Sequence, residues 1–147
     1  MVAVRPATAA DAGAVTEVFL ASRAAALPWL PVLHSAEETR GFIEHVVLAT
    51  QRTWVAVDGA DVVGFAALSP GHLEHLYLAP ARRRQGIGST LLRQVQEASP
   101  GGFDLWVFQR NTAARAFYER HGCRVLAETD GARNEEREPD VRYGWAR

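Results

Sequence analysis

The segment over residues 72–98 places an alternating strand, a turn with two glycines and an amphipathic helix in direct succession. We expect the strand over residues 72–78, ending near Pro80, and the helix over residues 87–98, where apolar side chains recur at helical spacing. A helix start leaves about four backbone N–H groups without partners and carries about half a positive charge. Gly86 and Gly88 carry no Cβ, so the backbone there can approach a ligand closely. The segment therefore predicts a site for an anion such as phosphate.

Arg82, Arg83 and Arg84 stand directly before these glycines. Arginines add fixed charge and bidentate donors for a phosphate group. Considered by itself, the run fits a solvated cluster of charges equally well. It does not fit the dinucleotide-binding pattern GxGxxG, because Leu91 stands where that pattern requires a third glycine. The arginines alone therefore do not identify the ligand.

The rest of the chain changes between helical and strand-like patterns. Thr8 with Asp11, and Ser35 with Glu38, have the spacing of capping boxes at helix starts. A hairpin is indicated by Asp-Gly at residues 58–59, between two apolar runs. The predicted order is a strand, two helices, three strands, a helix, a strand, a helix and two strands, which is a mixed α/β domain with helices packed on one sheet. The remaining strands are expected within residues 2–5, 53–69, 103–108, 124–128 and 141–145, and the remaining helices end at about residues 26, 48 and 121.

The composition excludes several classes of site. The 147 residues include no lysine, which excludes a Schiff-base lysine and the lysine of a GxxxxGK(S/T) phosphate loop. Cys123, the one cysteine, cannot form an intramolecular disulfide or a cysteine-rich metal site, and we expect no metal. The net charge of -1 gives no general attraction to nucleic acid or to anionic lipid. Without a long apolar run, we expect a soluble, cytoplasmic protein with no membrane partner.

Two blocks of the sequence resemble the GNAT superfamily of N-acetyltransferases. The first is HLEHLYLAPARRRQGIGSTLL, which is similar to the family's acyl-CoA signature, Q/R-x-x-G-x-G/A after a strand, with Arg83 at its first position. The second is LWVFQRNTAARAFYERHGCRVL, with Asn111 and the Phe117-Tyr118 pair at the family's positions. The resemblance implies one acetyltransferase domain over residues 1–147, with a mostly antiparallel sheet of six to seven strands flanked by about four helices.

The same resemblance implies that the chain binds acetyl-CoA as a co-substrate. Backbone groups of residues 76–78 would pair with the pantetheine arm. The N–H groups of residues 84–89 would hold the pyrophosphate, supported by Arg83, and the later strand and helix would contact the pantetheine and the acyl group. The implied cofactor-binding residues are Leu76, Tyr77, Leu78, Arg83, Arg84, Gln85, Gly86, Ile87, Gly88, Ser89, Asn111, Ala114, Phe117 and Tyr118.

Acetyl transfer to an amine needs an unprotonated nucleophile, a polarised thioester carbonyl and a proton for the leaving thiolate. The sequence has no obvious Ser-His-Asp or Cys-His arrangement, which agrees with direct attack by the amine. Tyr118 matches the tyrosine that the family places near the CoA sulfur, so we predict that it is the general acid. The alternative is a core tyrosine at a helical position.

The base is expected on the strand over residues 72–78, whose side chains alternate between two faces. By resemblance, proton acceptors come from positions that correspond to Glu74 and His72. We predict Glu74 first and His72 second, acting directly or through water. The alternative is that Glu74 is a polar strand residue satisfied by an arginine. The predicted faces are His72, Glu74 and Leu76 on one side and Leu73, His75 and Tyr77 on the other.

The acceptor side is predicted from loops. By resemblance, Trp29 and His34 lie in the region that closes over acceptors, and Gln109 follows the strand before the second helix of the signature. Arg137 belongs to the charged segment TDGARNEEREPD, which could reach the same mouth. For that segment, a solvated loop is the favoured interpretation, and recognition of a charged acceptor is the alternative.

The leading hypothesis is an acetyl-CoA-dependent N-acetyltransferase that acts by direct attack on a primary amine of a small molecule or a peptide. The alternative is a non-catalytic acyl-CoA-binding sensor or regulatory module of the same fold. Glu74 together with Tyr118 favours the enzyme, because a binding module needs neither. A nucleic-acid-binding protein that uses the arginine run is disfavoured by the near-neutral charge. We therefore expect no nucleic-acid partner, and a homodimer stays open.

Overall fold

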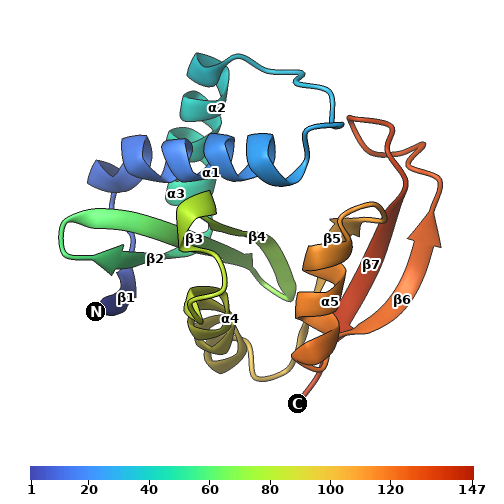
Figure 1. Ribbon diagram of the computed structural model, residues 1–147. Coiled ribbons are helices and arrows are strands. Elements are labelled where there is room, and N and C mark those ends of the chain that lie inside the picture. The colour runs from blue at the N-terminus through green and yellow to red at the C-terminus, as the bar shows by residue number, and fades with distance from the viewer.

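The computed structural model describes residues 1–147. Seven strands form one sheet in the order β1-β2-β3-β4-β5-β7-β6 (Figure 1). The strands are β1 (Val2–Pro6), β2 (Arg52–Asp58), β3 (Asp61–Ser69), β4 (His72–Leu78), β5 (Phe103–Phe108), β6 (Arg124–Thr129) and β7 (Asp140–Trp145). The helices are α1 (Ala12–Ala26), α2 (Ala36–Phe42), α3 (Leu48–Thr50), α4 (Ile87–Ala98) and α5 (Thr112–Arg120), with a π-helical turn over Ile43–Val47 joining α2 to α3. This succession of strands and helices confirms the predicted order.

The helix starts follow the predicted caps. Ser35 Oγ accepts a hydrogen bond from the Glu38 backbone N–H at 3.0 Å, and the Glu38 carboxylate accepts one from the Ser35 N–H at 2.9 Å. Before α1, the Asp11 carboxylate accepts a hydrogen bond from the Thr8 N–H at 2.8 Å and two from Arg5 at 2.9 Å. The chain entering α1 and the start of α2 are therefore fixed by local side chains. None of the helices combines the length and the apolar character that a membrane crossing requires.

The sheet splits between β4 and β5. These strands are parallel and share one register pair, His72 with Asp104, whereas every other pair of neighbouring strands is antiparallel. Beyond this pair the two strands diverge, as Figure 1 shows. The strand edges that face the gap therefore have no strand partner, and the gap separates a β1–β4 half from a β5–β7–β6 half.

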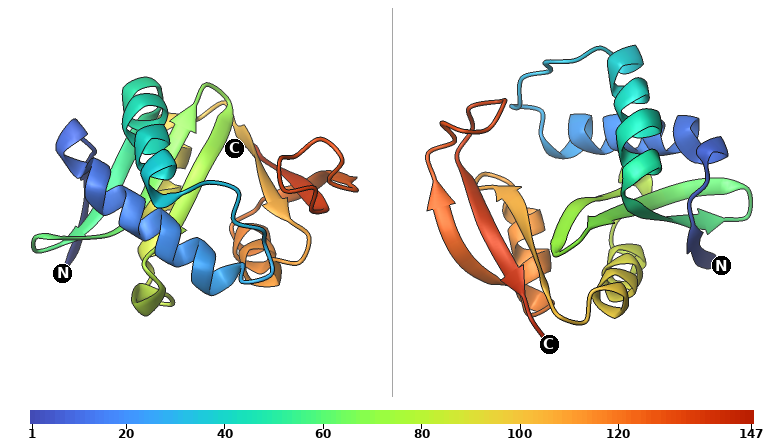
Figure 2. Two further views of the ribbon diagram at one scale, coloured as in Figure 1. Left: turned by 90° about the horizontal axis from the view of Figure 1, so that it is seen from above. Right: turned by 180° about the vertical axis from the view of Figure 1, so that it is seen from behind.

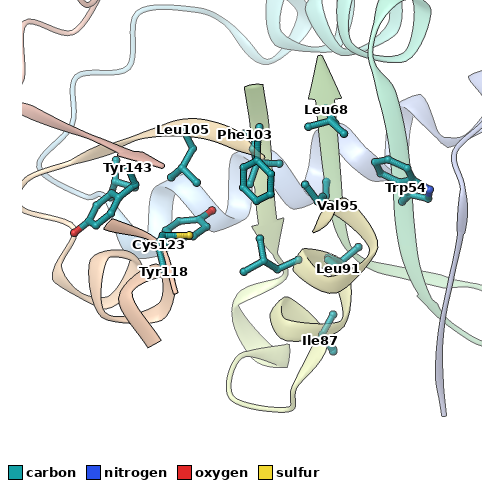
Figure 3. Close-up of a cluster of buried hydrophobic side chains, with 14 of the residues drawn as sticks. Trp54, Leu68, Ile87, Leu91, Val95, Phe103, Leu105, Tyr118, Cys123 and Tyr143 are labelled. Atoms are coloured by element: carbon teal, nitrogen blue, oxygen red, sulfur yellow. The ribbon is translucent and has the colours of Figure 1, made fainter. Parts of the chain in front are cut away.

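The helices cover the two halves differently (Figures 1 and 2). Helices α1 and α2 lie over one face of the β1–β4 half, α4 lies on the opposite face, and α5 packs beside β5 and β7. The larger apolar cluster, between the sheet, α4 and α5, is drawn in Figure 3. The predicted apolar spacing of α4 is confirmed, because its buried face carries Ile87, Leu91, Leu92 and Val95.

A β-bulge interrupts the pairing of β4 with β3. Leu73 lies opposite Leu68, and His75 lies opposite Ala67, so Glu74 is an extra residue on β4. A bulge places two consecutive residues opposite one partner residue and breaks the two-residue alternation of side chains. The strict alternation predicted for this strand is therefore wrong.

The bulge changes which side chains of β4 share a face. Leu73 and Leu76 both pack in the larger cluster, although alternation predicts opposite faces for them. Glu74 turns the other way, where it accepts a hydrogen bond from the Ser69 hydroxyl at 2.8 Å. The face toward α1 carries His72, Glu74, His75 and Tyr77, and the face toward α4 carries Leu73, Leu76 and Leu78.

Replacement of a buried α4 leucine tests the packing. Leu91 is 0% exposed, so Leu91→Ala is expected to lower the free energy of unfolding by about 2 to 5 kcal/mol in urea titrations. Leu33→Ala is the control, because Leu33 is 46% exposed in the loop before α2, and it should change stability by about 0.5 kcal/mol or less. Equal losses in the two variants would contradict the position of Leu91 in the core.

Candidate active site

A cleft of about 660 Å³ opens where β4 and β5 diverge. Its walls come from β4, from β5, from α5 and from the loop between β6 and β7. The cleft thus brings together segments from both of the sequence blocks described above. Tyr118 and Glu74, the predicted acid and the first-choice base, both line it.

Tyr118 presents its hydroxyl to the cleft from a buried position. The residue is 7% exposed, and its ring packs in the larger apolar cluster beside Cys123 (Figure 3). The hydroxyl makes no hydrogen bond to another group of the chain. Burial raises the pKa of Tyr118 well above its usual range, so the phenol keeps its proton at neutral pH.

Glu74 lies on the opposite wall of the cleft. The bulge turns its side chain toward α1, and about one third of it (32%) is exposed. One carboxylate oxygen accepts the bond from Ser69, and the other lies 3.6 Å from Nε2 of His72. The expected arginine partner of Glu74 is not found, and its polar neighbours are Ser69 and His72 instead.

His72 stands at the point where the sheet splits and does not line the cleft. Its Nδ1 lies 2.5 Å from a carboxylate oxygen of Asp104 on β5. Asp104 also accepts a hydrogen bond of 2.6 Å from Arg142 on β7. Burial opposes ionisation of Asp104, but the hydrogen bonds from His72 and Arg142 and the charge of Arg142 outweigh it, and the pKa of Asp104 is lowered.

Sequence reasoning missed Asp104 and Arg142. The only local signal is that Asp104 is the single acidic residue in the apolar strand FDLWVF. Its partner, His72, is 32 residues away, and their contact depends on β5 lying parallel to β4. Such a neighbour relation is not encoded by any local pattern.

His75 also lines the cleft, from an aromatic surrounding. Its ring contacts Phe19, Phe42, Phe65 and Tyr77 at centroid distances between 5.8 and 6.2 Å. Burial lowers the pKa of His75 to about 4, with a smaller contribution from the charge of Arg23. The imidazole is therefore neutral at pH 7.

The glycine turn before α4 has the geometry of an anion site. Arg84 and Gly86 both have positive φ angles, of 62° and 80°. No acceptor within the chain takes a hydrogen bond from the backbone N–H groups of Ile87, Gly88 or Ser89, the first turn of α4. A non-glycine residue with positive φ stores backbone strain, and such strain concentrates at ligand sites. The turn therefore offers several converging N–H donors to a negative ligand.

The side chains of the arginine run point to different partners. Arg82 pairs with Asp58 at the end of β2, which ties it to the β2–β3 hairpin. Arg83, Arg84 and Gln85 are exposed. Arg83, Arg84 and the following Gln85 are therefore free to approach a ligand at the turn, whereas Arg82 is not.

Strand β4 and helix α5 close around this turn. A Cβ on Gly88 would lie 3.2 Å from the ring of Phe117 and 3.5 Å from Leu78. Leu76 and Tyr77 line the cleft, whereas Leu78 and Phe117 pack beside Gly88 outside its lining. We call the glycine turn over residues 84–89 the anion turn. Gly88 is thus the residue at which the anion turn contacts β4 and α5.

Helix α5 is fixed at both ends near the cleft. At its start, Asn111 accepts a hydrogen bond from the Ala114 N–H at 3.3 Å, and both residues line the cleft. At its end, His121 Nδ1 lies 2.8 Å from the Phe117 carbonyl oxygen, and Nε2 lies 2.9 Å from Ser89 Oγ on α4. The carbonyl oxygen can only accept, so Nδ1 of His121 donates to it, and the other ring nitrogen is joined to the Ser89 hydroxyl. Sequence reasoning missed His121, which joins α5 to the anion turn.

Two of the predicted acceptor-side residues hold loops together. The guanidinium of Arg110 lies 4.1 Å from the centroid of the Trp29 ring, and Trp29 packs edge-on against Phe108. His34 pairs with Glu135 in the β6–β7 loop, where Figures 1 and 2 show the two loops meeting. Neither Trp29 nor His34 lines the cleft.

The other two predicted residues, Gln109 and Arg137, do not line the cleft either. Gln109 Nε2 donates to the carbonyl oxygen of Thr129 at 2.9 Å and to that of Asp140 at 3.2 Å, which fastens the end of β5 to the start of β7. Arg137 is exposed, with a φ of 56°. From the charged loop, Asp130 and Arg133 line the cleft instead.

No group of three or more His, Cys, Asp or Glu side chains that could hold a metal ion is present. Cys123 is buried, and burial raises the pKa of its thiol to about 11. A protonated, buried thiol is a poor nucleophile. Cys123 therefore acts as a packing residue beside Tyr118.

Comparison with known proteins assigns the chain to a family. A family model described as an acetyltransferase (GNAT) domain matches residues 49–124, which is half of the chain. The chain belongs to the GNAT acetyltransferase family. This confirms the resemblance identified in the two sequence blocks, and it makes the chain an N-acetyltransferase by class.

Individual members of the family also match the chain. Peptidyl-lysine N-acetyltransferase YiaC of Escherichia coli is 27% identical over 124 residues, which cover 84% of this chain and 84% of YiaC. Peptidyl-lysine N-acetyltransferase YjaB of Salmonella typhimurium is 36% identical over 78 residues, about half of each chain (52% and 53%). The PaiA N-acetyltransferase of Thermoplasma acidophilum, solved in complex with coenzyme A, superposes with a TM-score of 0.79 at 20% identity, covering 100% of this chain and 99% of PaiA. The superposition confirms the predicted GNAT-type fold.

The buried imidazole of His75 makes the stability of this GNAT domain depend on pH. The folded chain holds the pKa of His75 at about 4, and unfolding returns it to about 6.5. Between these values the unfolded state binds a proton that the folded state does not, so stability falls as pH is lowered from about 6.5 to about 4. The loss is on the order of 3 kcal/mol.

Urea unfolding at pH 7 and at pH 4.5 measures this loss. His75→Phe removes the titrating group, so the variant should lose less stability between the two pH values than the unsubstituted chain. His45→Phe makes the same change at an exposed histidine and should keep the full dependence. If all three proteins lose stability equally, His75 is not the group responsible.

Proposed function

We propose that the chain transfers an acetyl group from acetyl-CoA to a primary amine by direct attack, and that the preferred amine is the side chain of a peptidyl lysine. The GNAT family assignment supports the transfer, and the names of the relatives YiaC and YjaB support this acceptor class. A small-molecule amine is the second acceptor class.

One observation carries this proposal. A buried tyrosine hydroxyl and a partly exposed carboxylate, those of Tyr118 and Glu74, line the same cleft. A protonated phenol can supply the proton that a leaving thiolate needs, and an ionised carboxylate can accept the proton of an attacking amine. The two groups come from elements on opposite sides of the split sheet, so an acetyl donor and an amine can meet between them.

The residues around the cleft fit acetyl-CoA. The first-turn N–H groups of α4, with Arg83 and Arg84 exposed beside them, fit a pyrophosphate. The edge of β4 that faces the gap lacks a strand partner and fits the amide groups of a pantetheine arm. When bound, acetyl-CoA supplies the thioester carbonyl that the amine attacks.

The charges of the cleft favour a cationic acceptor. Among the charged residues of the lining, Glu74, Asp130 and Asp140 are acidic, and Arg133 is basic. An excess of carboxylates raises the local concentration of an ammonium group. Glu74 then removes the proton that must leave before the amine can attack, either directly or through water. His72 lies next to Glu74, on the side away from the amine.

Tyr118→Phe tests the general acid. The variant keeps the ring and its packing but loses the proton donor, so kcat should fall by about 100- to 10,000-fold while the KM for acetyl-CoA changes little. Tyr143→Phe is the matched control, because Tyr143 is another buried tyrosine of the same cluster whose hydroxyl bonds Glu119 outside the cleft. Steady-state thiol release with a lysine peptide measures both variants.

The outcomes separate the assignments. Full turnover in Tyr118→Phe would show that the acid lies elsewhere. Tight acetyl-CoA binding without thiol release for any peptide or small amine would instead favour the non-catalytic acyl-CoA-binding module.

Gly88→Val tests the anion turn independently of the chemistry. A side chain at this position collides with Phe117, so the first turn of α4 must shift and acetyl-CoA affinity should fall by about tenfold or more. Gly101→Val is the control, because a Cβ on Gly101 meets nothing within 4 Å. Isothermal titration with acetyl-CoA measures both, and equal affinities would remove Gly88 from the binding site.

A further inference from the structure

Polar side chains form a continuous line across the split in the sheet. Arg142 on β7 donates to one oxygen of Asp104 on β5 at 2.6 Å, and the other oxygen lies 2.5 Å from Nδ1 of His72 on β4. On the far side of the same imidazole, Nε2 lies 3.6 Å from Glu74. The line therefore ends at a carboxylate that lines the cleft.

The partners of His72 determine its tautomer. Asp104 is ionised at neutral pH, and an ionised carboxylate only accepts hydrogen bonds, so Nδ1 of His72 must carry a proton. A neutral imidazole then has its lone pair on Nε2, the nitrogen that faces Glu74. His75 on the same strand is another titratable group near this imidazole, and it is buried and neutral.

We propose, on the basis of the acetyl transfer proposed above, that Asp104 and Arg142 are positioning residues which hold His72 with Nε2 as a proton acceptor beside Glu74. His72 then takes over the proton that Glu74 receives from the amine. Neither positioning residue belongs to the two sequence blocks that indicate the family.

The step is a proton transfer without any change of oxidation state. The amine loses an N–H bond to a Glu74 oxygen, and Glu74 passes the proton to Nε2, which regenerates the carboxylate and forms an imidazolium. Asp104 stabilises that cation, and the imidazole, which is 27% exposed, releases the proton to water. Because 3.6 Å exceeds a hydrogen-bond length, the transfer needs a rotation of the Glu74 side chain or a bridging water.

The competing explanation is that the hydrogen bond between His72 and Asp104 only holds β4 and β5 together. These two residues also form the one register pair between the two strands. Such a tie needs a hydrogen bond but no particular tautomer. Asp104→Asn separates the two explanations. With its carbonyl oxygen toward Arg142, the new amide donates to Nδ1, so the ring proton moves to Nε2 and the acceptor beside Glu74 is lost.

The tautomer is measured by 15N NMR on the full chain labelled at histidine, with His72→Gln identifying the signal. We expect a protonated Nδ1 and an unprotonated Nε2 in the unsubstituted chain, and the reverse in Asp104→Asn. This measurement needs no activity, so it distinguishes an error in the positioning from an error in the proposed function.

Kinetics with acetyl-CoA and a lysine peptide test the consequence. In Asp104→Asn, kcat should fall by about 10- to 100-fold while the KM for acetyl-CoA changes by less than about twofold. Asp11→Asn is the matched control, because it also removes a carboxylate that is paired with an arginine, Arg5, but at the start of α1. It should leave the tautomer and kcat unchanged. Arg142→Gln keeps Asp104 and should keep the tautomer, with a smaller fall in kcat.

Three results would overturn the positioning role. They are an unprotonated Nδ1 in the unsubstituted chain, a reversed tautomer in Asp104→Asn with unchanged kcat, and an equal fall of kcat in Asp11→Asn. If Asp104→Asn does not fold, unchanged kcat in Arg142→Gln overturns the role as well. A correct tautomer in a chain that acetylates no amine would refute the proposed function and the proton transfer, while the orientation of His72 would stand.

Discussion

The single register pair between β4 and β5 is the constraint on which the rest of the structure depends. Backbone polar groups require partners, and a continuous sheet would supply them along the whole length of both strands. Because the strands part after His72 and Asp104, β4 keeps a free edge and side chains from both halves reach one cleft. A fully paired β5 would fill this space and leave the hydroxyl of Tyr118 buried without a partner.

Two helices place different chemical groups at this gap. The start of α4 directs free N–H groups outward, and α5 supplies Tyr118, a buried tyrosine that lines the cleft. The hydrogen bond between Ser89 and His121 and the contact of Gly88 with Phe117 join the helices. A long ligand that binds the anion turn at one end therefore meets the tyrosine at a fixed distance along its length.

The sequence predicts the elements well because caps, apolar spacing and glycine turns are local. The strand that begins at residue 72 was expected to end near Pro80 and ends at Leu78, and the helix over residues 87–98 lies where it was predicted. The prediction of which β4 side chains share a face was wrong because of the bulge at Glu74. The bulge depends on how β4 pairs with β3, and no local sequence pattern indicates that pairing. Asp104 was missed for a related reason, since its contact with His72 depends on strand order. The acceptor-side loops were the least predictable part, because residues such as Trp29 take their contacts from other loops.

The bulge in β4 also has an evolutionary consequence. It gathers His72, Glu74, His75 and Tyr77 on the face toward α1 and leaves only leucines on the face toward α4. The groups proposed for proton transfer are therefore carried on one face of the strand, and a substitution of Glu74 or His72 leaves the leucines that pack against α4 in place. Descendants of this sequence can alter or lose the chemistry of this strand while they inherit the same scaffold.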